Sequence, residues 1–419
     1  MYIDLNLNLT STQTMLKEEL HRFAAETLRP ASIALDKLAD PEDVIKEGSV
    51  FWDVFKKFYE LEYHLALVVG KFGAAGELGG LDKHILAEEA GWGAADLATG
   101  LGATTSPYSL GLALATLTGN QRLMDDVVTP FLEDREAKNI GCWAITEPQH
   151  GSDAVLISAE QFSNPQITFD TYGRRDGDDW IINGAKSAWV SNGTVATHGT
   201  VHFAIDKSRG MIGTAIATMP LNIPGVTKGK PLNKLGQRAL NQGEIFFDDV
   251  RIPKEYVVVE PELYTPVLDM ILCGGNLSMA CAFTGLARAA FEEAMTYCKQ
   301  RTQGGKPLCE HQLVQRKLFD MFTKVEAARA LSRAVSEYNS MKMPPVLRHA
   351  IAAKVFATEA SFEVASDAVQ LFGGYGLSKD FLIEKLFRDA RASTIEDGVN
   401  DVLALASASS LIDTYVPER

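Results

Sequence analysis

The sequence predicts an α+β protein built from an N-terminal helical domain, a middle antiparallel β domain and a C-terminal four-helix bundle. Two changes in residue pattern support this order. Apolar residues recur at helical spacing over residues 1–138, β-forming residues and turn dipeptides dominate 139–258, and long helical segments return over 259–419. A chain of 419 residues is long enough to bury a core in each of these three domains.

The N-terminal domain opens with a segment of helical periodicity. In TQTMLKEELHRFAAETL, apolar residues recur every three or four positions between Met15 and Phe23. Because proline breaks the interior of a helix, we expect this helix to end at Pro30. Residues 51–69 and 81–98 continue the helical pattern.

The middle domain carries short strand-like runs separated by turn signals. The dipeptides Asp176-Gly177 and Asn183-Gly184 predict tight turns, and prolines separate runs such as EIFFDDV (244–250). These features are typical of antiparallel strands joined by hairpins.

Four helical segments predict the bundle of the C-terminal domain: 285–301, 313–342, 348–372 and 401–416. No charged residue occurs between Met270 and Ala287, but Gly274 and Gly275 interrupt this stretch. We therefore expect a buried core helix here and no membrane span.

Composition narrows the function classes. The net charge of −14 argues against a nucleic-acid partner, because binding phosphates in bulk requires basic surfaces. Five cysteines without C-x-x-C spacing fit a reducing compartment, and we expect a cytoplasmic protein. The histidines show no metal-ligand spacing, so no metal site is expected.

The chemistry-bearing residues gather in four islands. P-loop and G-x-S-x-G motifs are absent, and no G-x-G-x-x-G opens a βαβ unit, so a Rossmann nicotinamide enzyme is not expected. The islands are CWAITEPQHGSDA (142–154), GAKSAWVSNG (184–193), KLGQRALNQGEIFFDDVRIP (234–253) and, across the bundle, QRTQGGKPLCEHQ (300–312), QLFGGYG (370–376) and FRDARASTIEDGVND (387–401).

Together and in this order, the islands resemble the acyl-CoA dehydrogenase family over essentially the whole chain. The resemblance implies FAD bound between the β domain and the bundle, and an acyl-CoA substrate from which two hydrogens are removed. It also implies electron-transferring flavoprotein as the electron acceptor and a homo-oligomer, at least a dimer and usually a dimer of dimers.

The family pattern assigns roles to residues that match it. It implies contacts with the flavin ring by Trp143, Thr146, Trp189 and Ser191. The FAD of a neighbouring subunit would be contacted by Arg301 and Gln312, and its diphosphate and adenosine by Gln370, Gly373 and Gly374. The substrate would be contacted by Ser152, Asn276 and Gly398. The chain departs from the pattern at Gly304, where the family has an aromatic residue, and at Val399, where it has threonine.

The resemblance places Asp397 where most of the family has its catalytic glutamate. Removing the weakly acidic proton next to a thioester requires a desolvated carboxylate of raised pKa. Aspartate is shorter by one methylene, roughly 1.5 Å of reach. Two alternatives stay open: Glu396 is the base after a local shift, or the chain has lost dehydrogenation and uses its flavin differently.

Asp96 stands among alanines on a helix whose family counterpart lines the acyl tail. A carboxylate in such surroundings is costly unless it is paired. It is either structural or a second acid or base facing the acyl group, which would permit a 1,4-dehydrogenation of a cyclic enoyl-CoA. Relatives acting on alicyclic acyl-CoAs combine such aspartates, which suggests a short, branched or alicyclic substrate such as cyclohexane- or cyclohexene-carboxyl-CoA.

Two other activities on the same fold compete with the dehydrogenase. One is a flavin oxidase or monooxygenase, and the other is a non-redox acyl-CoA lyase of the desulfinase type. A missing base would favour the lyase, and Asp397 argues against it. A non-catalytic binding scaffold is disfavoured because the flavin-contacting residues persist.

Overall fold

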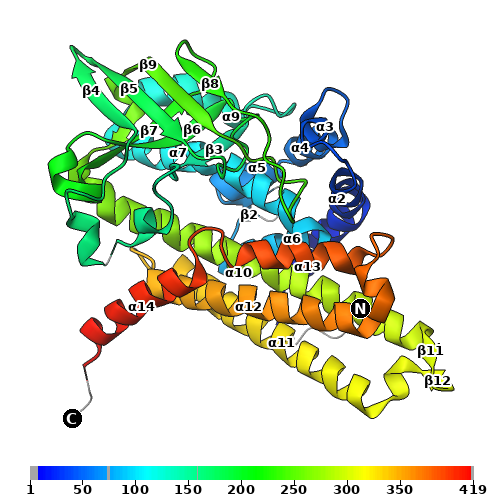
Figure 1. Ribbon diagram of the computed structural model, residues 1–419. Helices are drawn as coiled ribbons and strands as arrows, with labels where there is room; N and C mark the ends of the chain where they lie inside the picture. Colours follow the sequence, from blue (N-terminus) through cyan, green and yellow to red (C-terminus); the bar gives the residue numbers. More distant parts are fainter. Residues whose placement is uncertain (1–7, 73–75, 158, 417–419) are drawn as a thin grey trace.

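The computed structural model describes residues 8–72, 76–157 and 159–416. It confirms the predicted order of helices, sheet and helical bundle. Figure 1 shows the sheet above the long C-terminal helices, with α6 and α10 passing between the layers. The N-terminal helices are α1 (Ser11–Phe23), α2 (Arg29–Asp36), α3 (Glu42–Ile45), α4 (Val50–Glu60), α5 (Tyr63–Val68), α6 (Gly80–Thr104), α7 (Ser106–Thr118), α8 (Gln121–Leu123) and α9 (Thr129–Leu132).

The first helix does not end at Pro30, so that expectation is wrong. A single π-helical turn, Ala24–Leu28, joins α1 directly to α2. Pro30 lies in the first turn of α2, where a missing N–H is tolerated. The wider π turn thus lets the chain stay helical through the proline.

Eight strands form the sheet of the middle domain, in the order β10-β7-β6-β4-β5-β9-β8 with β3 pairing β6. Their bounds are β3 (Gly141–Ala144), β4 (Tyr172–Asp176), β5 (Asp179–Lys186), β6 (His198–Ala204), β7 (Thr214–Pro220), β8 (Val226–Lys228), β9 (Ile245–Pro253) and β10 (Val257–Val259). Two short hairpins lie outside this sheet: β1 (Lys71–Phe72) with β2 (Gly76–Glu77), and β11 (Thr302–Gln303) with β12 (Lys306–Pro307).

The sheet is mixed and not purely antiparallel as expected. Strand β3 runs parallel to β6, and β4 forms a further parallel pair with β6 at Tyr172 and Ala204. The turn predicted at Asp176-Gly177 joins β4 to β5. The turn predicted at Asn183-Gly184 is wrong, because Gly184 lies inside β5 at a bulge, where a Cβ would meet Thr171 Cα at 2.5 Å.

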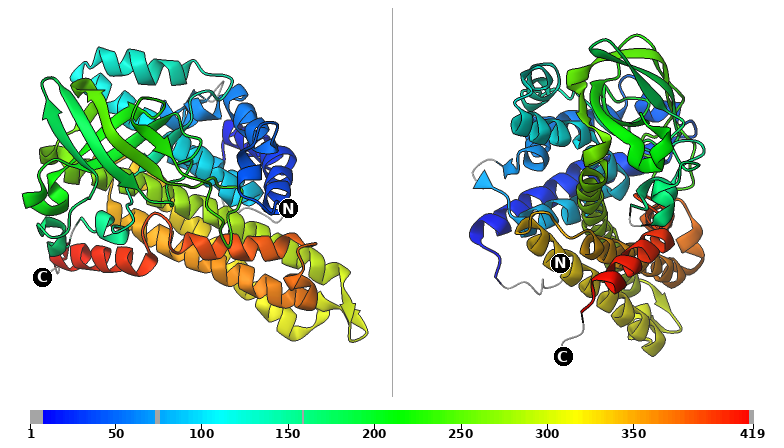
Figure 2. Two further views of the ribbon diagram at one scale, coloured as in Figure 1. Left: turned by 45° about the horizontal axis from the view of Figure 1, so that its top comes forward. Right: turned by 90° about the vertical axis from the view of Figure 1, so that its left-hand side faces the viewer.

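The C-terminal helices are α10 (Pro261–Gln300), α11 (Gln312–Ser340), α12 (Leu347–Phe372), α13 (Leu382–Ser393) and α14 (Asn400–Thr414). The fourth helix beside α10, α11 and α12 is α13, which contacts both α10 and α12. We had expected α14 in this place. Figures 1 and 2 show α14 projecting from the end of the bundle, where it contacts α12.

Among the described residues, α10 is the one helix long and apolar enough to cross a membrane, and most of its apolar stretch is buried. It packs closely against α6. A Cβ on Gly91 would lie 1.9 Å from the Ala282 carbonyl oxygen, and one on Gly285 would lie 2.0 Å from the Glu88 carbonyl oxygen. Glycines are therefore required for the backbones of the two helices to approach this closely.

A buried network of ion pairs stabilises the contact between α6 and α10. Glu88 on α6 accepts hydrogen bonds from Arg288 of α10 at 2.8 Å and from Arg329 of α11 at 2.9 Å. Burial opposes ionisation of Glu88, but the arginines outweigh it and hold its pKa well below the usual range. The network ties the N-terminal domain to the bundle.

Replacing Glu88 with alanine should lower the free energy of unfolding by about 3 kcal/mol, because the buried guanidinium groups of Arg288 and Arg329 each lose one carboxylate and keep only Glu89 and Glu326, respectively. The control is Asp43→Ala, which removes the exposed pair with Lys46 and should cost about 0.5 kcal/mol or less. Denaturant titration of both variants measures the difference. Equal effects would show that the network does not stabilise the domain contact.

Candidate active site

A cavity of about 1320 Å³ lies where the sheet, α6, α10 and the turn after α13 meet. Seven of the residues singled out from the sequence line it: Trp143, Thr146, Ser152, Trp189, Ser191, Asp397 and Gly398. They come from segments up to 255 residues apart in the chain, between positions 143 and 398. The predicted flavin and catalytic residues therefore share one chamber.

The sheet side of the cavity is built at the ends of β3 and β5. The hydroxyls of Thr146 and Ser187 are 2.8 Å apart, and the Ser187 N–H donates to the Thr146 carbonyl at 2.9 Å. Trp189 follows β5 and is 61% exposed, an unusual state for tryptophan. This wall offers hydroxyl groups and a flat aromatic surface to a ligand.

Trp143 is fixed from behind by a buried histidine. Its indole N–H donates to His202 Nε2 at 2.9 Å, and His202 Nδ1 lies 3.1 Å from the Tyr264 hydroxyl. Burial holds the pKa of His202 well below its usual value, so the ring is neutral and accepts this bond. The orientation of Trp143 is thus set before any ligand binds.

Asp397 lies on the opposite wall. It adopts a left-handed backbone conformation (φ 51°), which aspartate tolerates better than most residues, and Gly398 follows at φ 101°. A Cβ on Gly275 of α10 would lie 3.7 Å from Asp397 Oδ2, so the carboxylate faces this helix. Burial raises the pKa of Asp397, and the nearby Lys354 opposes the rise.

A second carboxylate lines the same cavity. Glu396 accepts a hydrogen bond of 2.6 Å from the Gln237 side-chain amide. Burial raises the pKa of Glu396 to about 7, with hydrogen bonding to Gln237 and the charge of Lys234 opposing the rise and Asp397 adding to it. Glu396 therefore lies at the cavity, but Gln237 occupies one of its carboxylate oxygens.

Asn276 does not line the cavity, in contrast to the expected substrate contact. Its side chain is fully buried and donates to the Leu272 carbonyl one turn back along α10, at 2.8 Å. Its neighbours Gly275 and Leu277 line the cavity instead. The correction follows from helix geometry, because adjacent positions on a helix face different directions.

Asp96 also lies away from the cavity. Its carboxylate accepts from Ser32 at 2.8 Å, from the Leu97 N–H at 2.8 Å and from Lys385 at 2.9 Å, and Lys385 also contacts Asp389. Although burial opposes ionisation, Lys385 and Ser32 hold the pKa of Asp96 below its usual value. These contacts support the structural alternative and leave a 1,4-dehydrogenation without a base at this position.

A second cavity of about 680 Å³ lies at the far end of the bundle. It is lined by Arg301, Gln370, Gly373 and Gly374, the residues to which the resemblance assigns contacts with FAD. Gln312 begins α11 and is exposed, and its neighbours Leu313 and Val314 line the cavity in its place. The four predicted residues are brought together from the C-terminal ends of two long helices, α10 and α12.

The residues of the two cavities fit FAD. A Cβ on Gly373 or Gly374 would meet nothing within 4 Å, so the backbone is open to a ligand there. An arginine beside open glycine amides suits a diphosphate, and the aromatic and hydroxyl-bearing wall of the large cavity suits a flavin ring. FAD dependence is thus supported by the donor groups present.

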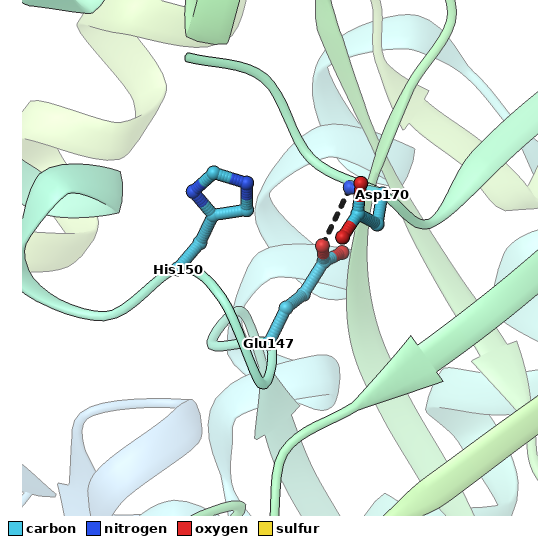
Figure 3. Close-up of side chains that lie close together, drawn as sticks. All are labelled: Glu147, His150 and Asp170. Atoms are coloured by element: carbon cyan, nitrogen blue, oxygen red, sulfur yellow. Dashed lines mark hydrogen bonds between the residues drawn. The ribbon is translucent and has the colours of Figure 1, made fainter.

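A cluster of possible metal ligands borders the large cavity. Figure 3 shows Glu147, His150 and Asp170, whose ligand atoms lie within 4.8 Å of one another. Both oxygens of Glu147 already accept hydrogen bonds, one from Lys186 at 2.7 Å and one from the Asp170 N–H at 2.6 Å. The Glu147 carboxylate therefore links Lys186 at the end of β5 to the segment before β4 through hydrogen bonds.

Several cavity residues escaped the sequence reasoning. Gln237, Gln242 and Lys234 lie in the third island, whose residues were recognised as a motif but given no roles. Glu396 was weighed only as an alternative base. The signal for Gln237 was its place in the motif, whereas its contact with Glu396 joins positions 159 residues apart and has no local signature.

Asp96→Ala should lower the free energy of unfolding by about 3 kcal/mol, because the buried groups Lys385, Ser32 and the Leu97 N–H lose their shared acceptor and Lys385 keeps Asp389 alone. Ser32→Ala, which removes only the neighbouring hydroxyl, should cost about 1 kcal/mol. Denaturant unfolding and activity per bound FAD are the measurements. Intact stability with loss of activity toward one acyl class alone would restore the second-acid hypothesis.

Comparisons with known proteins agree with this geometry. Family models described as the acyl-CoA dehydrogenase middle domain and C-terminal domain match residues 142–250 and 269–412. Short-chain specific acyl-CoA dehydrogenase of Rattus norvegicus is 32% identical over 98% of this chain and 92% of its own length. Cyclohexane-1-carbonyl-CoA dehydrogenase of Geobacter metallireducens is 32% identical over 70% of this chain and 73% of its own.

A solved structure gives the same result for the fold. Butyryl-CoA dehydrogenase of Megasphaera elsdenii superimposes with a TM-score of 0.83 at 28% identity, covering 97% of this chain and all of that one. Matching family models, relatives over nearly the full length and the residues of both cavities lead to one assignment. The chain belongs to the acyl-CoA dehydrogenase family of FAD-dependent oxidoreductases, which act on the CH–CH group of acyl-CoA thioesters.

Proposed function

We propose that this enzyme dehydrogenates a short, branched or alicyclic acyl-CoA, with Asp397 removing the proton next to the thioester. The observation that carries the proposal is the position of the Asp397 carboxylate. It faces α10 in the cavity that the predicted flavin residues line from the sheet side. A substrate between these walls would have the base on one side and the flavin ring on the other.

Different residues of the chain have different roles in this reaction. When bound, FAD supplies the acceptor for the hydride that leaves the β-carbon. Asp397 takes the α-proton, and its raised pKa makes it a stronger base than an exposed aspartate. Trp143, held by His202, and the hydroxyls of Thr146 and Ser187 line the opposite wall, where the aromatic ring and the hydroxyl groups would orient the flavin.

Small residues on facing helices support a bulky acyl group. A Cβ on Gly102 of α6 or on Gly274 of α10 would meet nothing within 4 Å, although both positions line the cavity. The open space beside them suits a branch or a ring better than a single thin chain. The similarity to a cyclohexane-1-carbonyl-CoA dehydrogenase supports the same substrate class.

The placement of the second cavity supports a homo-oligomer, which we propose to be a dimer of dimers. Gly274 and Arg301 belong to different cavities and are separated by about 40 Å along α10, at 1.5 Å per residue. This distance is too long for one dinucleotide. Arg301 and Gln370 would then hold the FAD whose ring lies in a neighbouring subunit.

We further propose electron-transferring flavoprotein as the acceptor that reoxidises the enzyme, and a reducing compartment such as the cytoplasm as its location. All five cysteines are unpaired, and four of them are buried, which fits such a compartment.

The function is tested by anaerobic mixing of the holoenzyme with straight-chain, branched and alicyclic acyl-CoAs. Bleaching of the flavin by a branched or alicyclic member, faster than by butyryl-CoA, is the expected result. Fast reaction with oxygen and release of peroxide would identify an oxidase instead. Failure of every acyl-CoA to bleach the flavin would overturn the proposal.

Asp397→Asn should retain FAD and acyl-CoA binding but reduce the rate of flavin bleaching by several orders of magnitude, because an amide cannot accept the proton. Glu396→Gln is the matched control and should stay within about tenfold of the parent enzyme. Stopped-flow absorbance measures both rates. A large loss in Glu396→Gln with a small one in Asp397→Asn would assign the base to Glu396.

Arg301→Ala should weaken FAD binding by about tenfold to a hundredfold, since a charged hydrogen bond to the diphosphate is lost. Arg316→Ala, which removes an exposed arginine of α11 paired with Asp320, is the control and should leave FAD affinity unchanged. Flavin release on dilution gives the affinities. Equal retention of FAD in both variants would show that Arg301 does not bind the cofactor.

A further inference from the structure

A fully buried lysine lies behind the turn that carries Asp397. Lys354 belongs to α12, and its ammonium group donates to the Gly398 carbonyl at 2.8 Å and to Asn400 Oδ1 at 2.7 Å. Both acceptors lie within three residues of Asp397. Lys354 is not among the described residues that line the large cavity, so it reaches the turn from the side opposite the substrate.

The turn needs such support because Asp397 holds a left-handed backbone conformation that residues other than glycine adopt rarely. The next position requires glycine, because its φ is also positive and a Cβ on Gly398 would lie 2.8 Å from the Leu403 side chain. Strained backbone persists only where the surroundings determine it from several sides. Besides Lys354, Thr358 one turn further along α12 accepts a hydrogen bond of 3.0 Å from the Asn400 amide.

The charge of Lys354 is directed at the carboxylates of the site. Both of its hydrogen-bond acceptors are neutral, and burying an ammonium group on such partners alone is unfavourable. Burial lowers the pKa of Lys354 to about 8, and the negative charges of Asp397, Glu396 and Glu359 oppose this fall. In return, Lys354 is the group that counteracts the effect of burial on Asp397.

We infer that Lys354 is a positioning residue of the reaction: it holds the Asp397–Asn400 turn in place and keeps a positive charge behind the Asp397 carboxylate without touching the substrate. This inference rests on the proposed role of Asp397 as the base. Of the other charged groups, Glu396 and Glu359 act on Lys354 and Lys234 acts on Glu396. The large cavity is also lined by Lys83, Glu147, His150, Arg388 and Arg391, and all of these groups stay in place in the variants below.

The test compares three variants of the FAD-loaded enzyme. Lys354→Met keeps the length of the side chain but removes its charge and its donors. Lys354→Arg keeps both charge and donors. Thr358→Val removes the second hydrogen bond from α12 to Asn400 and leaves the charge unchanged. For each variant, kcat/KM is measured against pH with the acyl-CoA that bleaches the parent flavin fastest, together with KM and FAD content.

In Lys354→Met, the acidic limb of the kcat/KM profile should shift to higher pH by about one unit or more, because Asp397 then keeps its proton to higher pH. The kcat of this variant should fall by about tenfold to a hundredfold, with KM and FAD content little changed. Lys354→Arg should return the limb toward its original position. Thr358→Val should lower kcat while leaving the limb where it is.

An unchanged limb and kcat in a folded, FAD-loaded Lys354→Met variant would overturn the inference. A shifted limb in Thr358→Val equal to that in Lys354→Met would also overturn it, since a general loosening would then explain both. If Lys354→Met does not fold, Lys354→Gln, which keeps a donor but no charge, carries the same measurement. An inactive parent enzyme would refute the proposed function and not this inference.

Discussion

The close packing of α6 against α10 is the constraint on which the site depends. Gly91 and Gly285 let the two backbones approach, and the buried Glu88–Arg288–Arg329 network fastens them to α11. The sheet then lies over the same two helices, and the large cavity is the space left between the layers. Because α10 is shared by both cavities, its 40-residue length also sets the distance between the two groups of predicted FAD contacts.

The sequence predicts the fold and most of the site because the signals are local. Periodicity changes mark the helical and β regions, and the motifs around Thr146, Arg301 and Gly373 place residues that the structure groups into two cavities. Two predictions that relied on a single local signal, a proline or a turn dipeptide, are wrong. Pro30 marked a helix end, but a π turn accommodates it, and Asn183-Gly184 marked a turn, but the pair forms a bulge.

The alternatives that the sequence leaves open at Asp96 and Glu396 share a physical cause. Asp96 among alanines is compatible with a structural and with a substrate-facing role, because its partner Lys385 lies 289 positions further along the chain. The contact between Glu396 and Gln237 also joins residues far apart in the chain, and no local sequence pattern indicates it. Pairing of buried charges is decided by tertiary contacts, so a sequence shows that a charge must be paired without showing where.

Two buried lysines of the bundle, Lys385 and Lys354, differ in what their charges do. Lys385 contacts two carboxylates, Asp96 and Asp389, and these charges outweigh the effect of burial and raise its pKa. Lys354 has neutral oxygens as acceptors, and burial lowers its pKa to about 8. The charge of Lys385 is neutralised within its own network, whereas the field of Lys354 extends to Asp397. An aspartate in place of the family's glutamate has less reach, so its turn must be held more firmly, and the contacts of Lys354 are directed at that turn.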